Sequence, residues 1–283
     1  MSNSNQSQTE RRVIFLIIFL GVMLPMIFPL GLKTEVSPQA KMVYDLIEST
    51  PKGAKVIVSF DYDPSSAPEL HPMAKAIIEH AWRKGHCVAV MALWPQGVQL
   101  AGNVFTKLKE KYPNKKYGID YVNLGYKPSG MVTIQAMGRN IYDVFPQDML
   151  KNDLHQVPMF HNIKTIKDFS YIVGLSAGDP GLKQWIMAAH DMYGVKVTGG
   201  TTAVSTPGFV PYINNQNQLY GLLGGLKAAA EYEMMVGIKG PATVKMDAQA
   251  VAHVLILSFI AIGNFKSWRS KNKKRIIINN TEG

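Results

Sequence analysis

The chain has 283 residues, a hydrophobic fraction of 47% and a formal net charge of +10. Its single cysteine, Cys87, excludes a disulfide within the chain. Eight basic and only two acidic residues lie in the two ends, 1–32 and 248–283, so most of the basic excess is outside the middle of the chain. We therefore expect no basic groove and no nucleic-acid partner.

The first predicted element is a membrane-spanning helix over 13–32. Residues 1–12 are polar and are predicted to form a disordered cytoplasmic tail. The segment from Val13 to Leu32 has no charged residue over 20 positions, which is long enough to span a hydrocarbon core about 30 Å thick. The apolar run is longer than that of a cleaved signal peptide and no small-x-small cleavage site follows, so we expect an uncleaved anchor.

The segment 35–245 is predicted to be one soluble α/β domain. Continuous apolar runs predict strands that are buried on both faces, at 55–60, 87–93, 121–124, 169–175 and 196–201. Helical patterns lie before and between them, at 37–49, 72–84, 97–112, 182–193 and 219–236. Residues 131–145 fit a helix or a strand, and 146–168 are typical of an irregular crossing loop. The alternation predicts a mostly parallel, doubly wound (Rossmann-like) sheet with helices on both faces.

A second membrane-spanning helix is predicted at 248–265. An amphipathic or buried helix is the alternative, because this apolar run is short and contains His253. A tryptophan and six basic residues follow in the tail 266–283, as expected of a cytoplasmic flank. The expected location is the bacterial cytoplasmic membrane, with the lipid bilayer as a partner, both termini cytoplasmic and the α/β domain extracytoplasmic.

Polar and aromatic residues follow the predicted strands, where an open parallel sheet binds its ligands. They are small polar side chains flanked by large aromatic ones, which is the composition of a binding pocket but also of ordinary loops. The candidate ligand-binding residues are Trp94, Tyr126, Asp179, Thr201 and Thr202.

Asp61 and Asp63 form a D-x-D pair directly after the first predicted strand. The pattern resembles the opening motif of haloacid-dehalogenase-type phosphatases, in which the first aspartate is the nucleophile and the second is the general acid. The acidic pair expected at a later strand end is missing, since that strand ends in Thr198-Gly199-Gly200-Thr201. The alternative is a pair of loop aspartates that cap the next turn.

Ser176 lies in a G-x-S-x-G sequence between a predicted strand and a helix, which is the context of a hydrolase nucleophile. The histidines that follow are His190, on the next helix, and His253, in the second apolar segment. Neither position suits a catalytic base. A tight turn formed by glycines is the alternative.

The sequence indicates no cofactor and no metal site. No G-x-G-x-x-G follows the first strand and no phosphate-binding loop motif is present. The histidines show no zinc-type spacing with acidic residues or cysteine.

Gly221, Gly224 and Gly225 lie within the predicted helix 219–236. Glycine destabilises a helix by about 1 kcal/mol relative to alanine, so three of them indicate a special role. Gly221 and Gly225 would share a helix face and allow a close helix–helix approach at a subunit interface. Packing of this helix on the domain's own sheet is the alternative.

Several stretches together resemble an uncharacterised bacterial family of membrane-anchored proteins with a Rossmann-like α/β domain. They are VIVSFDYDPSSAPE, VAVMALWPQG, YVNLGYKPSG, IVGLSAGDPG and YGLLGGLKAAAEYE, and the resemblance covers most of residues 35–240. No activity is known for the family. We expect a binding, sensing or scaffolding module that partners other membrane-protein subunits or forms a homo-oligomer. The alternative is a membrane-anchored hydrolase that uses Asp61 and Asp63, or Ser176.

Overall fold

The structure is a computed structural model that describes residues 2–32, 35–214 and 217–279. The chain divides into two compact units, which are described separately. One consists of Met1–Leu32 with Thr243–Gly283, and the other is Lys33–Ala242.

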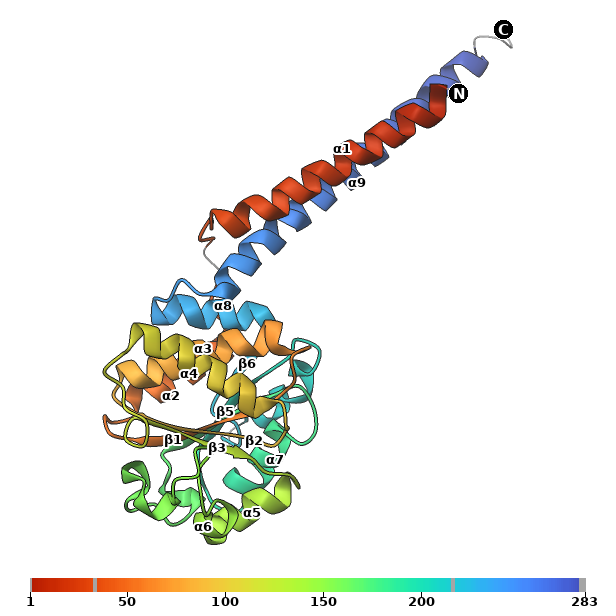
Figure 1. Cartoon of the computed structure of the whole chain (residues 1–283). Helices are drawn as coiled ribbons and strands as arrows, with labels where there is room; N and C mark the ends of the chain where they lie inside the picture. Colours follow the sequence, from red (N-terminus) through yellow and green to blue (C-terminus); the bar gives the residue numbers. More distant parts are fainter. Residues whose placement is uncertain (1, 33–34, 215–216, 280–283) are drawn as a thin grey trace. The chain divides into compact units, whose positions relative to one another are not determined.

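The larger unit contains a sheet of six parallel strands, which confirms the predicted parallel sheet (Figure 1). The strands are β1 (Lys55–Asp61), β2 (Cys87–Ala92), β3 (Tyr121–Tyr126), β4 (Tyr171–Ser176), β5 (Val197–Thr201) and β6 (Leu222–Gly224). Their order is β3-β2-β1-β4-β5-β6. The strands β2 and β3 are therefore added on one side of β1, and β4, β5 and β6 are added on its other side. In sheets of this order, ligands bind outside the carboxyl ends of the strands, near the point where the side of addition changes.

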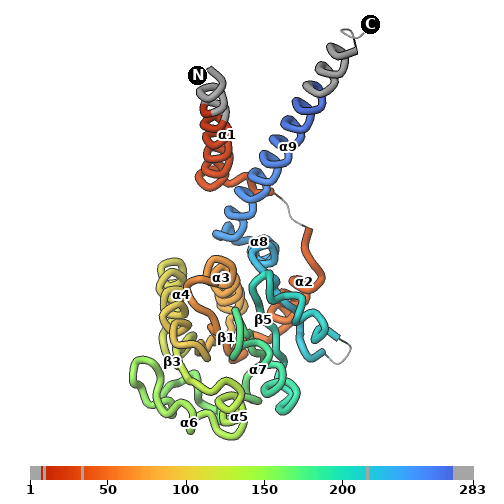
Figure 2. The backbone as a smooth tube through the Cα atoms, turned by 90° about the vertical axis from the view of Figure 1, so that its right-hand side faces the viewer, coloured from red at the N-terminus to blue at the C-terminus, as the bar shows by residue number. Residues whose placement is uncertain are grey.

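Helices cover both faces of the sheet, as Figures 1 and 2 show from two directions. One face carries α2 (Pro38–Ser49), α3 (Ala67–Arg83), α4 (Gly97–Lys111) and α8 (Gly225–Val236). The other carries α5 (Met131–Arg139), α6 (Ile141–Val144) and α7 (Leu182–Gln184), which continues as the π-helix η4 (Trp185–His190). Apolar strands are sandwiched between these layers, and Val56, Ile57 and Val58 of β1 are fully buried.

Local sequence signals explain where several helices begin. The Ser37 side chain accepts a hydrogen bond from the Ala40 N–H and caps α2, as predicted. Helix α3 begins at Ala67, earlier than the predicted residue 72, because Pro68 fits the first turn of a helix. The ambiguous region 131–145 forms α5 and α6. The crossing loop 146–168 contains the 3₁₀ turns η1 (Leu154–Gln156), η2 (Pro158–Phe160) and η3 (Ile166–Asp168).

The predicted helix 219–236 is wrong in its first part. Leu222–Gly224 form β6 beside β5, and α8 begins only at Gly225. Gly221 and Gly225 have φ values of +107° and +66°, so neither continues a right-handed helix. The three glycines therefore do not share a helix face. The loop before β6 contains the 3₁₀ turns η5 (Thr206–Gly208) and η6 (Val210–Tyr212).

The glycines instead allow close packing inside the domain. A Cβ atom at Gly221 would lie 2.6 Å from the Val43 nitrogen of α2, and one at Gly224 would lie 2.6 Å from Thr206. A Cβ atom at Gly225 would lie 2.7 Å from the Ala203 Cβ. The three glycines thus lie against α2 and the loop after β5.

The smaller unit contains α1 (Ser2–Ile27) and α9 (Pro241–Asn279). Helix α1 begins at Ser2 and so includes most of the tail 1–12, for which disorder was predicted. A Cβ atom at Gly21 of α1 would lie 2.3 Å from the Leu255 side chain of α9, so the two helices are in contact there. Among the described residues, one helical segment is long and apolar enough to cross a membrane: Pro241–Arg269, with a mean hydropathy of 1.7.

Candidate functional site

The register of the sheet places three predicted site residues side by side at the carboxyl ends of neighbouring strands. Asp61 of β1 pairs with Ser176 of β4, and Ser176 pairs with Thr201 of β5. All three side chains are buried. The arrangement therefore brings the residues together, and the surroundings of each side chain decide whether it is available to a ligand.

Asp61 is fully buried and forms three hydrogen bonds within the domain. Its carboxylate accepts from the Ser59 hydroxyl at 2.6 Å, from the Leu93 N–H at 2.8 Å and from Trp185 Nε1 at 2.9 Å. Burial raises the pKa of Asp61 to about 6, although the three donors favour the charged form. The carboxylate thus ties β1 to the start of the β2–α4 loop and to η4, and it is not exposed as a nucleophile.

Asp63 caps the loop that leads into α3. Its Oδ1 accepts from the Ser65 N–H and hydroxyl and from the Ser66 N–H, at 2.7 to 3.2 Å. These hydrogen bonds lower the pKa of Asp63, the Ser65 hydroxyl most of all. The alternative interpretation of a turn-capping aspartate explains this residue.

Ser176 is 1% exposed, and its hydroxyl oxygen accepts a hydrogen bond from the Leu182 N–H at 3.1 Å. It thereby closes the loop between β4 and α7. His190, the nearest histidine after it in the sequence, lies at the end of η4, where its Nδ1 is 3.1 Å from the Val195 carbonyl oxygen. The hydroxyl therefore stabilises a turn and is not presented to a substrate.

The remaining predicted residues at this edge mostly hold their own loops. Trp94 Nε1 donates to the Pro180 carbonyl at 2.7 Å, and Asp179 accepts from the Gln184 amide at 2.7 Å. The hydroxyl of Thr201 contacts that of Thr206 at 3.1 Å, and the hydroxyl of Thr202 donates to that of Ser205 at the same distance.

The N-terminus of α3 lies where a dinucleotide-binding domain holds phosphate, but it already carries negative charge. Asp63 accepts from backbone N–H groups just before this helix, and Glu69 in its first turn accepts from the Ala203 N–H at 2.9 Å. Two carboxylates at this helix end oppose a bound phosphate. The described residues contain no group of three or more His, Cys, Asp and Glu side chains that could hold a metal ion.

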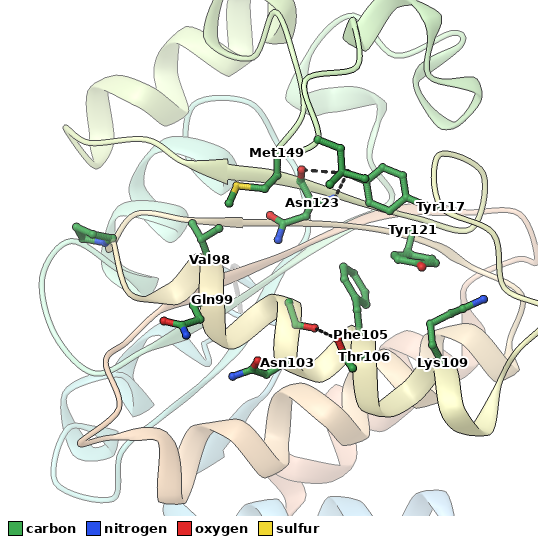
Figure 3. Close-up of a pocket in the computed structure, with 13 residues that line it drawn as sticks. Val98, Gln99, Asn103, Phe105, Thr106, Lys109, Tyr117, Tyr121, Asn123 and Met149 are labelled. Atoms are coloured by element: carbon green, nitrogen blue, oxygen red, sulfur yellow. Dashed lines mark hydrogen bonds between the residues drawn. The ribbon is translucent and has the colours of Figure 1, made fainter.

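A groove of about 840 Å³ lies elsewhere, between α4 and β3 (Figure 3). Its walls come from α4 with the residues before it, from β3 with Tyr117, and from the loop after α6. The lining residues are mostly apolar or uncharged polar, and they are Pro95, Val98, Gln99, Gly102, Asn103, Phe105, Thr106, Lys109, Tyr117, Tyr121, Asn123, Met149 and Leu150.

An aromatic cluster forms one end of the groove. The Phe105 ring lies 4.6 Å from Tyr121 between centroids, and Tyr117 lies 5.3 Å from Tyr121. Behind them, Trp82 stacks on Phe105 at 5.8 Å. At the groove rim, the side chains of Met149 and Leu150 are 53% and 63% exposed. Apolar surface at this rim is therefore available to a ligand.

The backbone at the outer edge of β3 is already hydrogen-bonded. The Tyr121 carbonyl accepts from the Gly118 N–H, and the Asn123 carbonyl accepts from the Met149 N–H at 2.8 Å. The Asn123 N–H donates to the Tyr117 hydroxyl at 3.3 Å. This edge of the sheet is thus protected against the addition of another strand.

Reasoning from the sequence missed this groove, because its walls come from three separate segments. One signal was available: Gln99, Asn103 and Thr106 recur at helical spacing and form a polar stripe on α4. Of the predicted site residues, Tyr126 lines a second, smaller cavity of about 370 Å³ beside the groove, with Lys127, Lys151 and the shared Met149. Trp94, Asp179, Thr201 and Thr202 line neither cavity.

No protein-family model matches the chain, and a search of curated proteins finds no match. Among solved structures, the chain is similar to the crystal structure of AibC, with 11% sequence identity and a TM-score of 0.32. The match covers 80% of this chain and 54% of that chain, so this chain spans about half the length of AibC. The sheet and the groove define the class of this protein, which is a parallel α/β domain with an open, apolar groove at one edge of its sheet.

Proposed function

We propose that the protein is a membrane-anchored α/β binding module that partners other membrane proteins and performs no catalysis. One observation carries this proposal: the two candidate nucleophiles, Asp61 and Ser176, are enclosed, whereas the α4–β3 groove is open. Asp61 and Ser176 are 0% and 1% exposed and hold the fold by hydrogen bonds. The groove instead offers exposed apolar and carboxamide side chains.

The membrane anchor is part of the proposal. The segment 13–32 and the helix Pro241–Arg269 are proposed to span the bilayer, with both termini cytoplasmic and the domain outside. Large apolar side chains along α1 and α9 are exposed in the structure, and they include Phe15 at 71%, Phe19 at 59%, Val254 at 63% and Leu257 at 66%. Contact with lipid would remove this surface from water.

An activity assay separates the binding module from the alternative hydrolase. The full-length protein in lipid nanodiscs is incubated with a phosphomonoester and with a carboxylic ester, with and without Mg²⁺. We expect no turnover that depends on Asp61 or Ser176. Turnover that is abolished by Asp61→Asn or by Ser176→Ala would contradict the proposal and establish the hydrolase.

A second experiment tests binding directly. A photo-crosslinking amino acid replaces Gln99 in the groove, or Lys107, which is exposed on the same helix but does not line the groove. In intact membranes we expect covalent adducts with other membrane proteins from position 99 and not from position 107. Equal yields at the two positions, or none at either, would count against the groove as the binding site.

A further inference from the structure

The part of α9 that is proposed to cross the membrane has polar side chains on the face turned away from α1. We propose that this face packs against α9 of a second copy of the same protein, so that the protein forms a parallel dimer within the membrane. This inference rests on the membrane anchor of the proposed function and names the partner of that anchor.

The contact with α1 shows which face of α9 is already covered. A Cβ atom at Gly21 of α1 would lie 2.3 Å from the Leu255 side chain and 3.5 Å from that of Val251, so these two residues of α9 face α1. His253 lies midway between them in the sequence. Since each residue turns a helix by about 100°, His253 points to the opposite side of α9. Its side chain is exposed there.

Other residues share this face with His253. Gln249, Ile256, Ile260 and Gly263 are exposed and follow one another, with His253, at alternating steps of four and three residues. Side chains at such steps form one line along a helix, and two parallel helices pack along a line of this kind. We call the line formed by residues 249, 253, 256, 260 and 263 the α9 seam.

His253 is the seam residue for which contact with lipid is most unfavourable. It lies about 7.5 Å inside the predicted start of the span at Ala248, where an imidazole that faces hydrocarbon is costly. Ser258, deeper in the same segment, donates to the Val254 carbonyl of its own helix at 2.7 Å and is therefore satisfied. A helix that covers the seam would give His253 a hydrogen-bond partner in place of lipid.

Gly263 fits the close approach of another helix at the far end of the seam. Glycine destabilises a helix relative to alanine, and no atom of the described residues lies within 4 Å of a Cβ placed at this position. The packing of Leu255 accounts for Gly21, whereas no contact within the chain accounts for Gly263. Small residues at the interface of membrane helices allow their backbones to approach each other.

The chemistry of the seam favours a second copy as the partner. A carboxamide and a neutral imidazole each have a donor and an acceptor, so Gln249 and His253 can each bind their own copy. Two copies share one orientation and one depth in the membrane, and a twofold axis places each seam residue opposite itself. No Asp, Glu, Lys or Arg lies between Ala248 and Phe265, so the paired segments do not repel each other.

The first test asks which face of α9 meets the second copy. Cys87→Ser removes the native thiol, and one cysteine is then introduced at Ile260, on the seam, or at Val254, which is 63% exposed but lies off the seam. Two differently tagged copies of the full-length protein are expressed together, and their membranes are oxidised with copper phenanthroline. We expect capture of one tag to recover the other through a disulfide for Ile260→Cys and not for Val254→Cys.

The second test measures the strength of association. Fluorescent proteins fused after Gly283 report energy transfer between copies in liposomes as the lipid is diluted. We expect His253→Leu to weaken association about 3- to 15-fold, the range for an interhelical hydrogen bond, and His253→Gln to restore it. Gly263→Leu should weaken it about tenfold or more, because the added side chain separates the backbones. Ala261→Leu adds a similar bulk off the seam and should change it by no more than about twofold.

The dimer is overturned if neither cysteine forms crosslinks, if both form them equally, or if Gly263→Leu and Ala261→Leu associate equally well. Carbonate extraction of the same membranes separates the two levels of failure. A protein that stays in the membrane without forming the dimer refutes only this inference, whereas a protein released by carbonate refutes the proposed anchor as well. Crosslinks from position 99 test the α4–β3 groove independently of either result.

Discussion

Asp61 is the residue whose environment departs most from the one expected. A carboxylate after the first strand of a parallel sheet suggested catalysis, but its three hydrogen bonds tie together β1, the β2–α4 loop and η4. Its raised pKa, about 6, results first from burial. A perturbed pKa marks functional sites often, yet a fully enclosed structural carboxyl group produces the same signal.

The raised pKa of Asp61 predicts how stability depends on pH. Below its unfolded pKa of 3.8, Asp61 is protonated in both the folded and the unfolded protein. As the pH rises, it ionises first in the unfolded chain, so its contribution to stability is lost between pH 3.8 and about 6. Two pKa units correspond to roughly 3 kcal/mol. Asp61→Asn should therefore show a flatter change in unfolding free energy between about pH 4 and 6, measured by guanidinium unfolding in detergent.

Asp63→Asn provides the matched control, because the contribution of Asp63 to stability depends on pH in the opposite direction. Hydrogen bonds lower the pKa of Asp63, so its contribution is present above its unfolded pKa and is lost as the pH falls through the folded value. Replacing it should make the protein less stable near neutral pH and leave the stability at strongly acidic pH unchanged. If wild type and Asp61→Asn keep parallel pH profiles, the structural assignment of Asp61 is wrong.

Gly221 shows how one residue without a side chain permits tertiary packing. With φ at +107° and a virtual Cβ only 2.6 Å from the Val43 nitrogen, it admits neither a side chain nor a right-handed helix. Gly221→Ala should lower the unfolding free energy by about 2–4 kcal/mol through strain and the clash with α2. Gly208→Ala, where no atom lies within 4 Å of the Cβ, should cost about 0.5 kcal/mol or less. Denaturant unfolding of the two variants gives the comparison, and equal losses would contradict the packing.

At the scale of elements, α8 holds both ends of the α/β unit through two buried carboxylates. Glu231 accepts from the Ser37 N–H at 3.0 Å and from its hydroxyl at 2.6 Å, just before α2. Glu233 accepts from the Ala242 N–H at 3.2 Å, in the first turn of α9. The segments that enter and leave the domain are therefore both fixed by the same helix.

This role of α8 predicts an effect of Glu231→Ala. The change leaves the Ser37 N–H and hydroxyl without their acceptor and should cost about 1–3 kcal/mol of unfolding free energy. Lys227→Ala removes only the exposed partner of the Lys227–Glu231 ion pair, 2.8 Å long, and should cost less than about 1 kcal/mol. Hydrogen exchange should also be faster at the start of α2 in the Glu231 variant only. Equal exchange in the two variants would show that α8 does not hold this end.

At the scale of the whole molecule, the proposed topology makes a prediction with two outcomes. If 13–32 and α9 both span the membrane, a fluorescent protein fused after Gly283 lies in the cytoplasm and fluoresces. Alkaline phosphatase fused after Ile238, before α9, lies outside and is active. An inactive phosphatase at the second position would place the domain in the cytoplasm and overturn the orientation.

The sequence by itself determined the features that depend on local pattern. Apolar runs of strand length separated by helical segments specify a parallel α/β sheet, because such strands must be buried on both faces. The Ser37 cap of α2 also follows from short-range chemistry, and the capping role of Asp63 was one of the two readings that the residues allowed.

The tertiary structure decided what depends on distant partners. Leu222–Gly224 form a strand only because β5 offers an edge for pairing, and Gly221 is tolerated only beside α2. The burial of Asp61 depends on Trp185, far along the chain. The α4–β3 groove arises from segments around residues 100, 120 and 150, and no local pattern encodes their approach. Hydrophobic periodicity reports which face of an element is buried, but the contacts that create a site are set by the packing of elements against one another.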